Sequence, residues 1–365
     1  MNLQFRHNGL TTLGKFDLKN WKTAVQTWRP PDDWVKISTI DAHTAGEPLR
    51  IYVDGFPEPT GQSVLQRRQD AARRLEFYRT ATIWEPRGHA DMYGCLIIPP
   101  ERSESQFGVL FLHNEGYSSM CGHGIIAVAT VAVEVAWISS EKPDIELNID
   151  APAGLIKTTV HREKEKIAGV SFENVPSFVA AVDQNVYVDG LGKVPYDLAY
   201  GGAYYAFVDA DAIGIRLQPD NQAQLVDYGR RIKRAVSDTM EISHPEHEDL
   251  SFLYGTIFTG DPQDPKHHSR NVCIFANGEV DRSPTGTGVS ARAAILAAKN
   301  ELQPNETITI ESILGTCFDV EVIGETTCGH QPAVIPRVRG NAFITGQHEF
   351  LFDPLDKLKK GFFLR

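Results

Sequence analysis

The sequence of 365 residues predicts an α+β protein of two similar domains, each a set of strands around one central helix, with the functional site between them. Three observations support this prediction. After residue 34, short apolar or alternating runs are separated by Gly, Pro and Asp, as is typical of strands joined by tight turns. Two segments, 122–137 and 286–302, are apolar or Ala-rich nearly all round, which indicates buried helices. These two segments also match each other.

Residues 1–34 are predicted to form an N-terminal extension outside both domains. Within it, Asp17 can cap a short helix that carries Leu18, Trp21, Val25 and Trp28 on one face. The Pro-Pro pair that follows ends this helix.

Strands dominate the part of the chain that follows the extension. Each predicted strand is a short run bounded by turn residues. The runs are Val35–Ile40, Leu49–Val53, Gly94–Ile98, Gly108–Leu112, Asp144–Ile149, Gly154–Val160 and Gly169–Glu173.

An internal duplication is the main evidence for two similar domains. The motif Cys121-Gly-His-Gly-Ile-Ile-Ala matches Thr285-Gly-Thr-Gly-Val-Ser-Ala at an offset of 164 residues. A strand with the pattern Ile-acid-small-x-x-Gly follows each motif, at Ile149 and at Ile310, an offset of 161 residues. Two motifs kept in order at nearly one offset indicate a repeat. We therefore expect domains over 35–190 and 191–339, with equivalent loops facing each other across a cleft.

The two helix starts carry the candidate chemistry. A Gly-x-Gly start leaves backbone N–H groups open at the positive end of a helix, which favours an anion such as a carboxylate. Cys121 precedes the first start, and such a position can lower the pKa of a thiol, so Cys121 is a candidate base or nucleophile. Asp281 lies shortly before the second start and suits a substrate ammonium.

Other polar residues have simpler explanations. Cys95, Cys273, Cys317 and Cys328 lie in strand-like runs or turns and are interpreted as structural. The segment His244-Pro-Glu-His247 resembles a ligand cluster, but its proline breaks helical spacing, so a solvated loop is favoured and no metal site is predicted. The adjacent histidines at 267 and 268 are also expected in solvent.

The composition excludes several classes of protein. A net charge of −11 argues against a nucleic-acid partner, which requires Lys and Arg on phosphates. The sequence contains no run of about 18 apolar residues, so no membrane span is predicted. The N-terminus lacks the apolar core of a secretory signal. Five scattered cysteines suit free thiols in a reducing compartment, so we expect a cytoplasmic protein.

A dinucleotide-binding site is a competing interpretation. Both Gly122–Ala127 and Gly286–Ala291 fit the pattern G-x-G-x-x-A. That fingerprint must follow a strand directly within alternating strands and helices, whereas here irregular residues intervene and the upstream strands have hairpin spacing. Titration with a nicotinamide cofactor would distinguish the two interpretations.

The chain resembles the proline racemase family from about residue 35 to about residue 346. The resemblance rests on long, specific motifs. They are Met120-Cys-Gly-His-Gly124, Asp281-Arg-Ser-Pro-Thr-Gly-Thr-Gly288, Asp41-Ala-His-Thr-Ala-Gly-Glu-Pro48, Pro86-Arg-Gly-His-Ala-Asp-Met-Tyr-Gly94, Gly201-Gly-Ala-Tyr-Tyr-Ala206 and His244-Pro-Glu-His247.

This resemblance implies a fold like that of diaminopimelate epimerase, in which the active site lies between the two domains. It also implies that C-terminal strands, within 340–365, return to complete the first domain. Family backbone groups at positions equivalent to Gly122, His123, Gly286 and Thr287 bind the substrate amino acid without a cofactor or a metal. The family aspartate at position 281, together with His123, holds the ring nitrogen.

The sequence departs from the family's racemases at one informative position. Those enzymes use two cysteines as bases on opposite faces of Cα, but Thr285 replaces the second one here. A hydroxyl is a far weaker acid than a thiol, so the pair can remove one α-proton but cannot readily return another from the opposite face. If the substrate carries a β-hydroxyl, the carbanion can expel it. The resemblance therefore implies dehydration of trans-3-hydroxy-L-proline to pyrroline-2-carboxylate, with Cys121 as base and Thr285 or water assisting the hydroxyl.

Two alternatives remain open at this stage. A racemase of proline or an epimerase of 4-hydroxyproline would use Thr285 or a water as the second acid. A non-catalytic amino-acid-binding protein would keep the cleft without needing a reactive Cys121. In each case the expected partner is a small cyclic imino acid, and a homodimer is compatible with the sequence.

Overall fold

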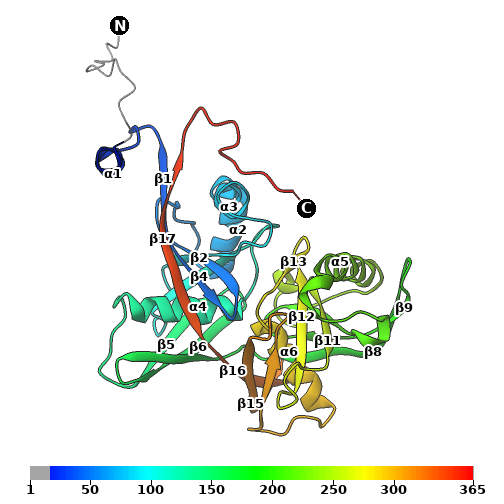
Figure 1. Cartoon of the computed structure of the whole chain (residues 1–365). Helices are drawn as coiled ribbons and strands as arrows, with labels where there is room; N and C mark the ends of the chain where they lie inside the picture. The colour runs from blue at the N-terminus through cyan, green and yellow to red at the C-terminus, as the bar shows by residue number, and fades with distance from the viewer. Residues whose placement is uncertain (1–16, 365) are drawn as a thin grey trace.

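The computed structural model describes residues 17–364. Its helices are α1 (Leu18–Thr27), α2 (Val64–Arg74), α3 (Glu76–Ile83), α4 (Gly122–Glu134), α5 (Gln222–Thr239) and α6 (Gly286–Ala298). Its strands are β1 (Val35–Thr44), β2 (Glu47–Asp54), β3 (Gly94–Ile98), β4 (Phe107–Leu112), β5 (Asp144–Ala151), β6 (Gly154–Glu163), β7 (Lys166–Glu173), β8 (Phe178–Val188), β9 (Gly192–Tyr200), β10 (Tyr204–Asp209), β11 (Leu253–Gly260), β12 (Ser269–Phe275), β13 (Glu279–Val280), β14 (Thr307–Glu311), β15 (Cys317–Cys328), β16 (Gln331–Gly340) and β17 (Ala342–Phe352). They form one mixed sheet that coils into two bodies (Figure 1).

The first body wraps its strands around α4. Strands β17, β1, β2, β3 and β4 pair in this order, and β5, β6, β7 and β16 continue the sheet. The helix contacts strands on several sides, among them β1, β7 and β17. This burial is possible because residues 122–132 include no charged side chain, and all of them are buried.

The second body repeats this arrangement around α6. Strands β8, β9, β10, β11, β12, β14, β15 and β16 pair in this order. A bridge between Ser177 and Val334 brings the start of β8 next to β16. Strand β16 also pairs with β7, so it links the two bodies. The predicted α+β architecture of two helix-centred bodies is confirmed.

The domain limits remain a proposal, and the strand pairing refines them. Strand β8 forms a hairpin with β9 and packs on α6, which favours a boundary ahead of Phe178 rather than at residue 190. Strand β17 lies antiparallel along β1, with Phe352 opposite Val35, so the C-terminal strand lies on the first body (Figure 1).

Both central helices are shorter than the sequence predicts. Instead of reaching residues 137 and 302, they end at Glu134 and Ala298. Ala136 and Asn300 have φ angles of 57° and 61°, and this left-handed conformation commonly terminates a helix. No helix among residues 17–364 is long and apolar enough to span a membrane.

The short helix in the N-terminal extension is confirmed as α1. The Asp17 carboxylate accepts a hydrogen bond of 2.9 Å from the Lys19 backbone N–H, as an N-cap does. The apolar residues on its face are all about half exposed, so α1 contributes nothing to either core. Residues 1–16 of the extension lie outside the described residues.

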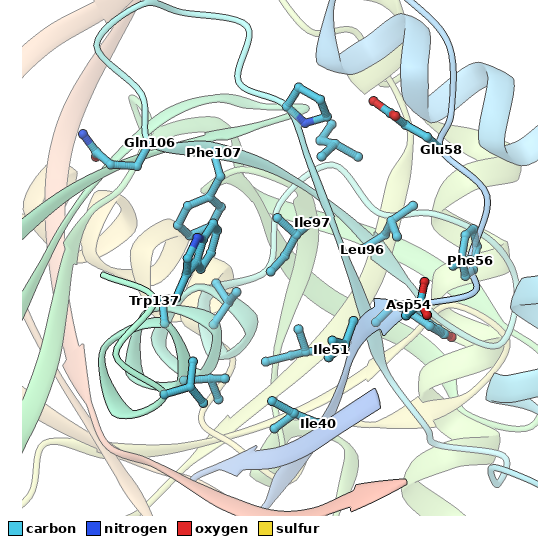
Figure 2. Close-up of a pocket in the computed structure, with 18 of the residues that line it drawn as sticks. Ile40, Ile51, Asp54, Phe56, Glu58, Leu96, Ile97, Gln106, Phe107 and Trp137 are labelled. Atoms are coloured by element: carbon cyan, nitrogen blue, oxygen red, sulfur yellow. The ribbon is translucent and has the colours of Figure 1, made fainter. Parts of the chain in front are cut away.

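An apolar groove opens into the first body beside the C-terminal half of α4. Figure 2 shows Ile40 and Ile51 from β1 and β2 facing it, with Phe107 and Trp137 on the opposite side. The groove is lined by strand residues, by loop residues such as Phe56 and Pro99, and by the far end of α4, and it contains none of the sequence-predicted site residues.

Candidate active site

A small cavity lies where the N-termini of α4 and α6 meet, between the two bodies. All seven sequence-predicted site residues line it: Cys121, Gly122, His123, Asp281, Thr285, Gly286 and Thr287. Tyr93, Met120, Tyr205, Tyr254 and Phe275 complete the lining. The tertiary structure thus brings together residues that lie up to 194 positions apart, from Tyr93 to Thr287.

Cys121 is the N-cap of α4. Its sulfur accepts a hydrogen bond of 3.2 Å from the Gly124 backbone N–H and lies 3.2 Å from His123 Nδ1. Burial raises the pKa of the thiol well above its ordinary value, and the Gly124 N–H opposes that shift only in part. The expectation of a lowered Cys121 pKa is therefore wrong, because the loss of hydration on burial outweighs the effect of the helix terminus.

Thr285 occupies the corresponding position before α6, but its backbone differs. It has a φ of 70°, compared with −146° for Cys121, and its side chain does not cap the helix. Its Oγ1 is buried and makes no well-formed hydrogen bond to the described residues. It lies near enough to Asp281 to lower the pKa of that carboxyl. A buried hydroxyl without a partner is costly, so this atom is available to a ligand.

Asp281 and His123 provide the titratable groups next to the two helix starts. Burial raises the pKa of Asp281 to about 6, although the Ser283 N–H donates to its Oδ1 at 2.7 Å. Burial lowers the pKa of His123 to about 3, so its imidazole is neutral at physiological pH. A neutral imidazole and a carboxylate can both receive hydrogen bonds from a ring ammonium.

Three buried tyrosines in the lining were not among the predicted site residues. The hydroxyl of Tyr93 lies 2.6 Å from Ser118 Oγ and 3.2 Å from the Tyr254 hydroxyl, and the Tyr205 hydroxyl lies 2.7 Å from Thr287 Oγ1. A signal was present, because Tyr-Gly occurs at 93 and at 254, at the same offset of 161 residues as the repeated strands. Tyr93 directly precedes β3, and Tyr254 is the second residue of β11.

A cluster of charged side chains connects the two bodies beside the cavity. Glu47, at the start of β2, accepts a 2.7 Å hydrogen bond from the Arg282 backbone N–H. The Arg282 guanidinium forms a 2.8 Å ion pair with Asp91. Since Arg282 follows Asp281 directly, these contacts tie the backbone next to Asp281 to the first body.

The comparison with known families agrees with this arrangement. The model of the family described as "Proline racemase" matches residues 39–363. The chain belongs to the proline racemase family.

Curated members of the family are similar over nearly their full length. A "Trans-3-hydroxy-L-proline dehydratase" of Colwellia psychrerythraea is 47% identical over 344 residues, covering 93% of this chain and 97% of the relative. A protein of the same name from Bacillus cereus is 45% identical, covering 90% and 98%. A "3-hydroxyproline 2-epimerase" of Burkholderia multivorans is 41% identical, covering 90% and 98%.

A solved structure has the same fold. The crystal structure of a hydroxyproline epimerase from Agrobacterium vitis, with bound trans-4-hydroxy-L-proline, has a TM-score of 0.86 to this chain at 29% identity. The match covers 92% of this chain and 96% of that one.

His244 and His267, which lie outside the cavity, have structural partners. His244 is buried, with its Nε2 3.9 Å from the Cys328 sulfur, so the prediction of a solvated position is wrong for this residue. His267 forms a 2.9 Å contact with Glu311 and is only partly exposed. No cluster of three or more metal-ligating side chains occurs within residues 17–364.

The two glycines at the helix starts hold the bodies together at the cavity, because their backbones touch. A Cβ on Gly286 would lie 2.6 Å from the Gly122 Cα, and backbone atoms there have no room to move aside. Alanine normally stabilises a helix relative to glycine. In Gly286→Ala the clash should dominate and cost about 1–3 kcal/mol of unfolding free energy, together with most of the activity.

Thermal unfolding and turnover of the Gly286→Ala variant test this prediction. Gly324→Ala in β15 is a matched control, since a Cβ there meets no atom within 4 Å. Equal stability and activity of both variants would show that the close approach of the helix starts is not required.

Proposed function

We propose that this chain catalyses the dehydration of trans-3-hydroxy-L-proline to pyrroline-2-carboxylate, as a lyase of the hydro-lyase class. The observation that carries the proposal is the pair of side chains at the two helix starts, a thiol at Cys121 and a hydroxyl at Thr285, which line the same cavity. Curated relatives at 45–47% identity are named for this activity.

Substrate binding follows from the charges around the cavity. The first N–H groups of α4 and α6 have no intrahelical partner, so Gly122, His123, Gly286 and Thr287 can bind the substrate carboxylate. Asp281, whose carboxylate accepts a hydrogen bond from the Ser283 N–H, pairs with the ring ammonium. The ammonium also removes the repulsion that the Asp281 carboxylate exerts on a Cys121 thiolate.

The reaction then needs one base at Cα. Cys121 takes the α-proton, and the helix-start N–H groups stabilise the negative charge that develops on the carboxylate. The electron pair forms the C2–C3 double bond as the C3 hydroxyl departs. The enamine product tautomerises to the cyclic imine. Thr285 cannot act as a second base, since its hydroxyl is far less acidic than a thiol.

Incubation with trans-3-hydroxy-L-proline, followed by reduction of the imine to proline, tests the proposal. We expect imine to accumulate without any added cofactor. If no imine forms while the substrate is inverted at Cα, the chain is an epimerase. That alternative has support in the relative named 3-hydroxyproline 2-epimerase.

The cytoplasm is the proposed location. All five cysteines are free thiols, which is typical of proteins in a reducing compartment. Fractionation of the source cells tests this part of the proposal.

Asp281→Asn should weaken binding of L-proline strongly. The change leaves the ring ammonium in a buried cavity without its counter-charge, which typically costs on the order of 2–5 kcal/mol. Because the Asp281 pKa is raised to about 6, the carboxylate is protonated below that pH, so kcat/KM of the wild type should fall as the pH drops through 6.

Calorimetric titration with L-proline and a pH–rate profile check this prediction. The acidic limb near pH 6 should be absent from the Asp281→Asn variant. Unchanged affinity for L-proline, which carries a charged nitrogen, would remove Asp281 from the substrate site.

A further inference from the structure

The stereochemistry of the substrate decides where the leaving hydroxyl must be protonated, if the proposed function holds. In trans-3-hydroxy-L-proline the hydroxyl lies opposite the carboxylate, so it lies on the same ring face as the Cα hydrogen. Cys121 is the base, and therefore it faces that hydrogen and the hydroxyl together. Thr285, at the opposing helix start, faces the other side. The group that protonates the departing oxygen therefore belongs to the Cys121 side of the cavity.

Tyr93 is the neutral oxygen acid on that side. Its ring lies 4.8 Å from the His123 ring, edge to face, and His123 Nδ1 in turn lies 3.2 Å from the Cys121 sulfur. Its hydroxyl is close enough to Cys121 to stabilise the thiolate. The Tyr205 hydroxyl is hydrogen-bonded to Thr287 Oγ1 on α6, so Tyr205 lies toward the opposite helix start.

His123 is poorly suited to the same role. Burial lowers its pKa to about 3, so it carries no second proton to give at neutral pH. Burial raises the pKa of Tyr93 well above 10, so its phenol keeps its proton until a stronger base such as hydroxide forms beside it.

We propose that Tyr93 is the general acid that protonates the departing C3 hydroxyl, and that Tyr254 and Ser118 position it. Both neighbouring hydroxyls, at 3.2 and 2.6 Å, can donate to the Tyr93 oxygen. This arrangement leaves the Tyr93 proton free for the substrate and provides two hydrogen bonds for the phenolate that remains.

The protons balance without any further reactant. The Cys121 thiolate forms an S–H bond with the α-proton, and the C–H electron pair becomes the C2–C3 double bond. The C3–O bond breaks with its electrons on oxygen, which takes the Tyr93 proton and leaves as water. The Cys121 thiol then returns a proton to the Tyr93 phenolate, which restores both groups.

Tyr93→Phe tests the assignment with three readouts. Dehydration of trans-3-hydroxy-L-proline should fall by about 10²–10⁴-fold, the usual contribution of a positioned acid. Deuterium exchange at Cα of L-proline in deuterated water should fall far less than dehydration, because it needs Cys121 as the base but no acid for a leaving group, and loses only the support of Tyr93 for the thiolate. Elimination from trans-3-fluoro-L-proline should also persist, because fluoride leaves without being protonated.

Tyr200→Phe is the matched control. It removes another buried tyrosine oxygen, one without a hydrogen-bond partner and outside the cavity lining, and should leave all three readouts unchanged.

Each other outcome overturns the proposal or its premise. Equal loss of all three readouts in Tyr93→Phe would mean that Tyr93 shapes the cavity and donates no proton. Retention of all three would mean that the Cys121 thiol itself returns the proton to the hydroxyl. Absence of dehydration in the wild type would instead contradict the proposed function, whatever the variant does.

Discussion

Cys121→Ser is expected to abolish dehydration while the fold survives. A hydroxyl replaces a thiol of similar size, but it cannot be deprotonated at neutral pH in a site where burial already raises the pKa of the thiol. The loss should be at least about 10²–10⁴-fold, the range typical of a positioned base. Turnover and thermal unfolding of the same preparation measure both parts of the prediction.

A second cysteine provides the control for the Cys121 prediction. Cys317 is partly exposed and lies outside the cavity lining, so Cys317→Ser should keep full activity. Substrate should protect one thiol of the wild type, and no thiol of Cys121→Ser, from alkylation. Near-normal turnover of the Cys121→Ser variant with unchanged thermal stability would remove Cys121 as the base.

Thr285→Cys should convert the site from one base to two. The repeat places Thr285 at the start of α6 where Cys121 stands at the start of α4, and both line the same cavity. A thiol at 285 therefore faces the substrate Cα from the side opposite Cys121. We expect the variant to invert proline or 4-hydroxyproline at Cα, an activity that the wild type should have only weakly.

Optical rotation and deuterium incorporation, measured side by side for both proteins, check this result. Exchange from both faces should be fast in the Thr285→Cys variant and weak in the wild type. Dehydration should persist, because the acid assigned to the hydroxyl is Tyr93 on the Cys121 side; a large loss of dehydration would instead support direct assistance by Thr285. A wild-type protein that racemises proline as fast as the variant would show that Thr285 does not separate lyase from isomerase here.

Local sequence signals predicted much of the site. The helices α4 and α6 lack a polar side, so each was predicted to be enclosed by the rest of its domain. The duplication of their Gly-x-Gly starts predicted that the two helix starts face each other. The departure at Thr285 within an otherwise matching motif indicated the chemistry. The amphipathic helices α2, α3 and α5 were not predicted, and none of their residues line the cavity.

The sequence alone therefore determined the architecture and the residues at the two helix starts, since both follow from patterns a few residues long. Only the tertiary structure decided the contacts between distant segments. It placed the hydroxyls of Tyr93 and Tyr254 within hydrogen-bond distance and formed the hydrogen bond between Glu47 and the Arg282 backbone. It also brought the backbones of Gly122 and Gly286 into contact. It also reversed the expected shift of the Cys121 pKa, because that pKa depends on how completely both bodies exclude water, which no short motif encodes.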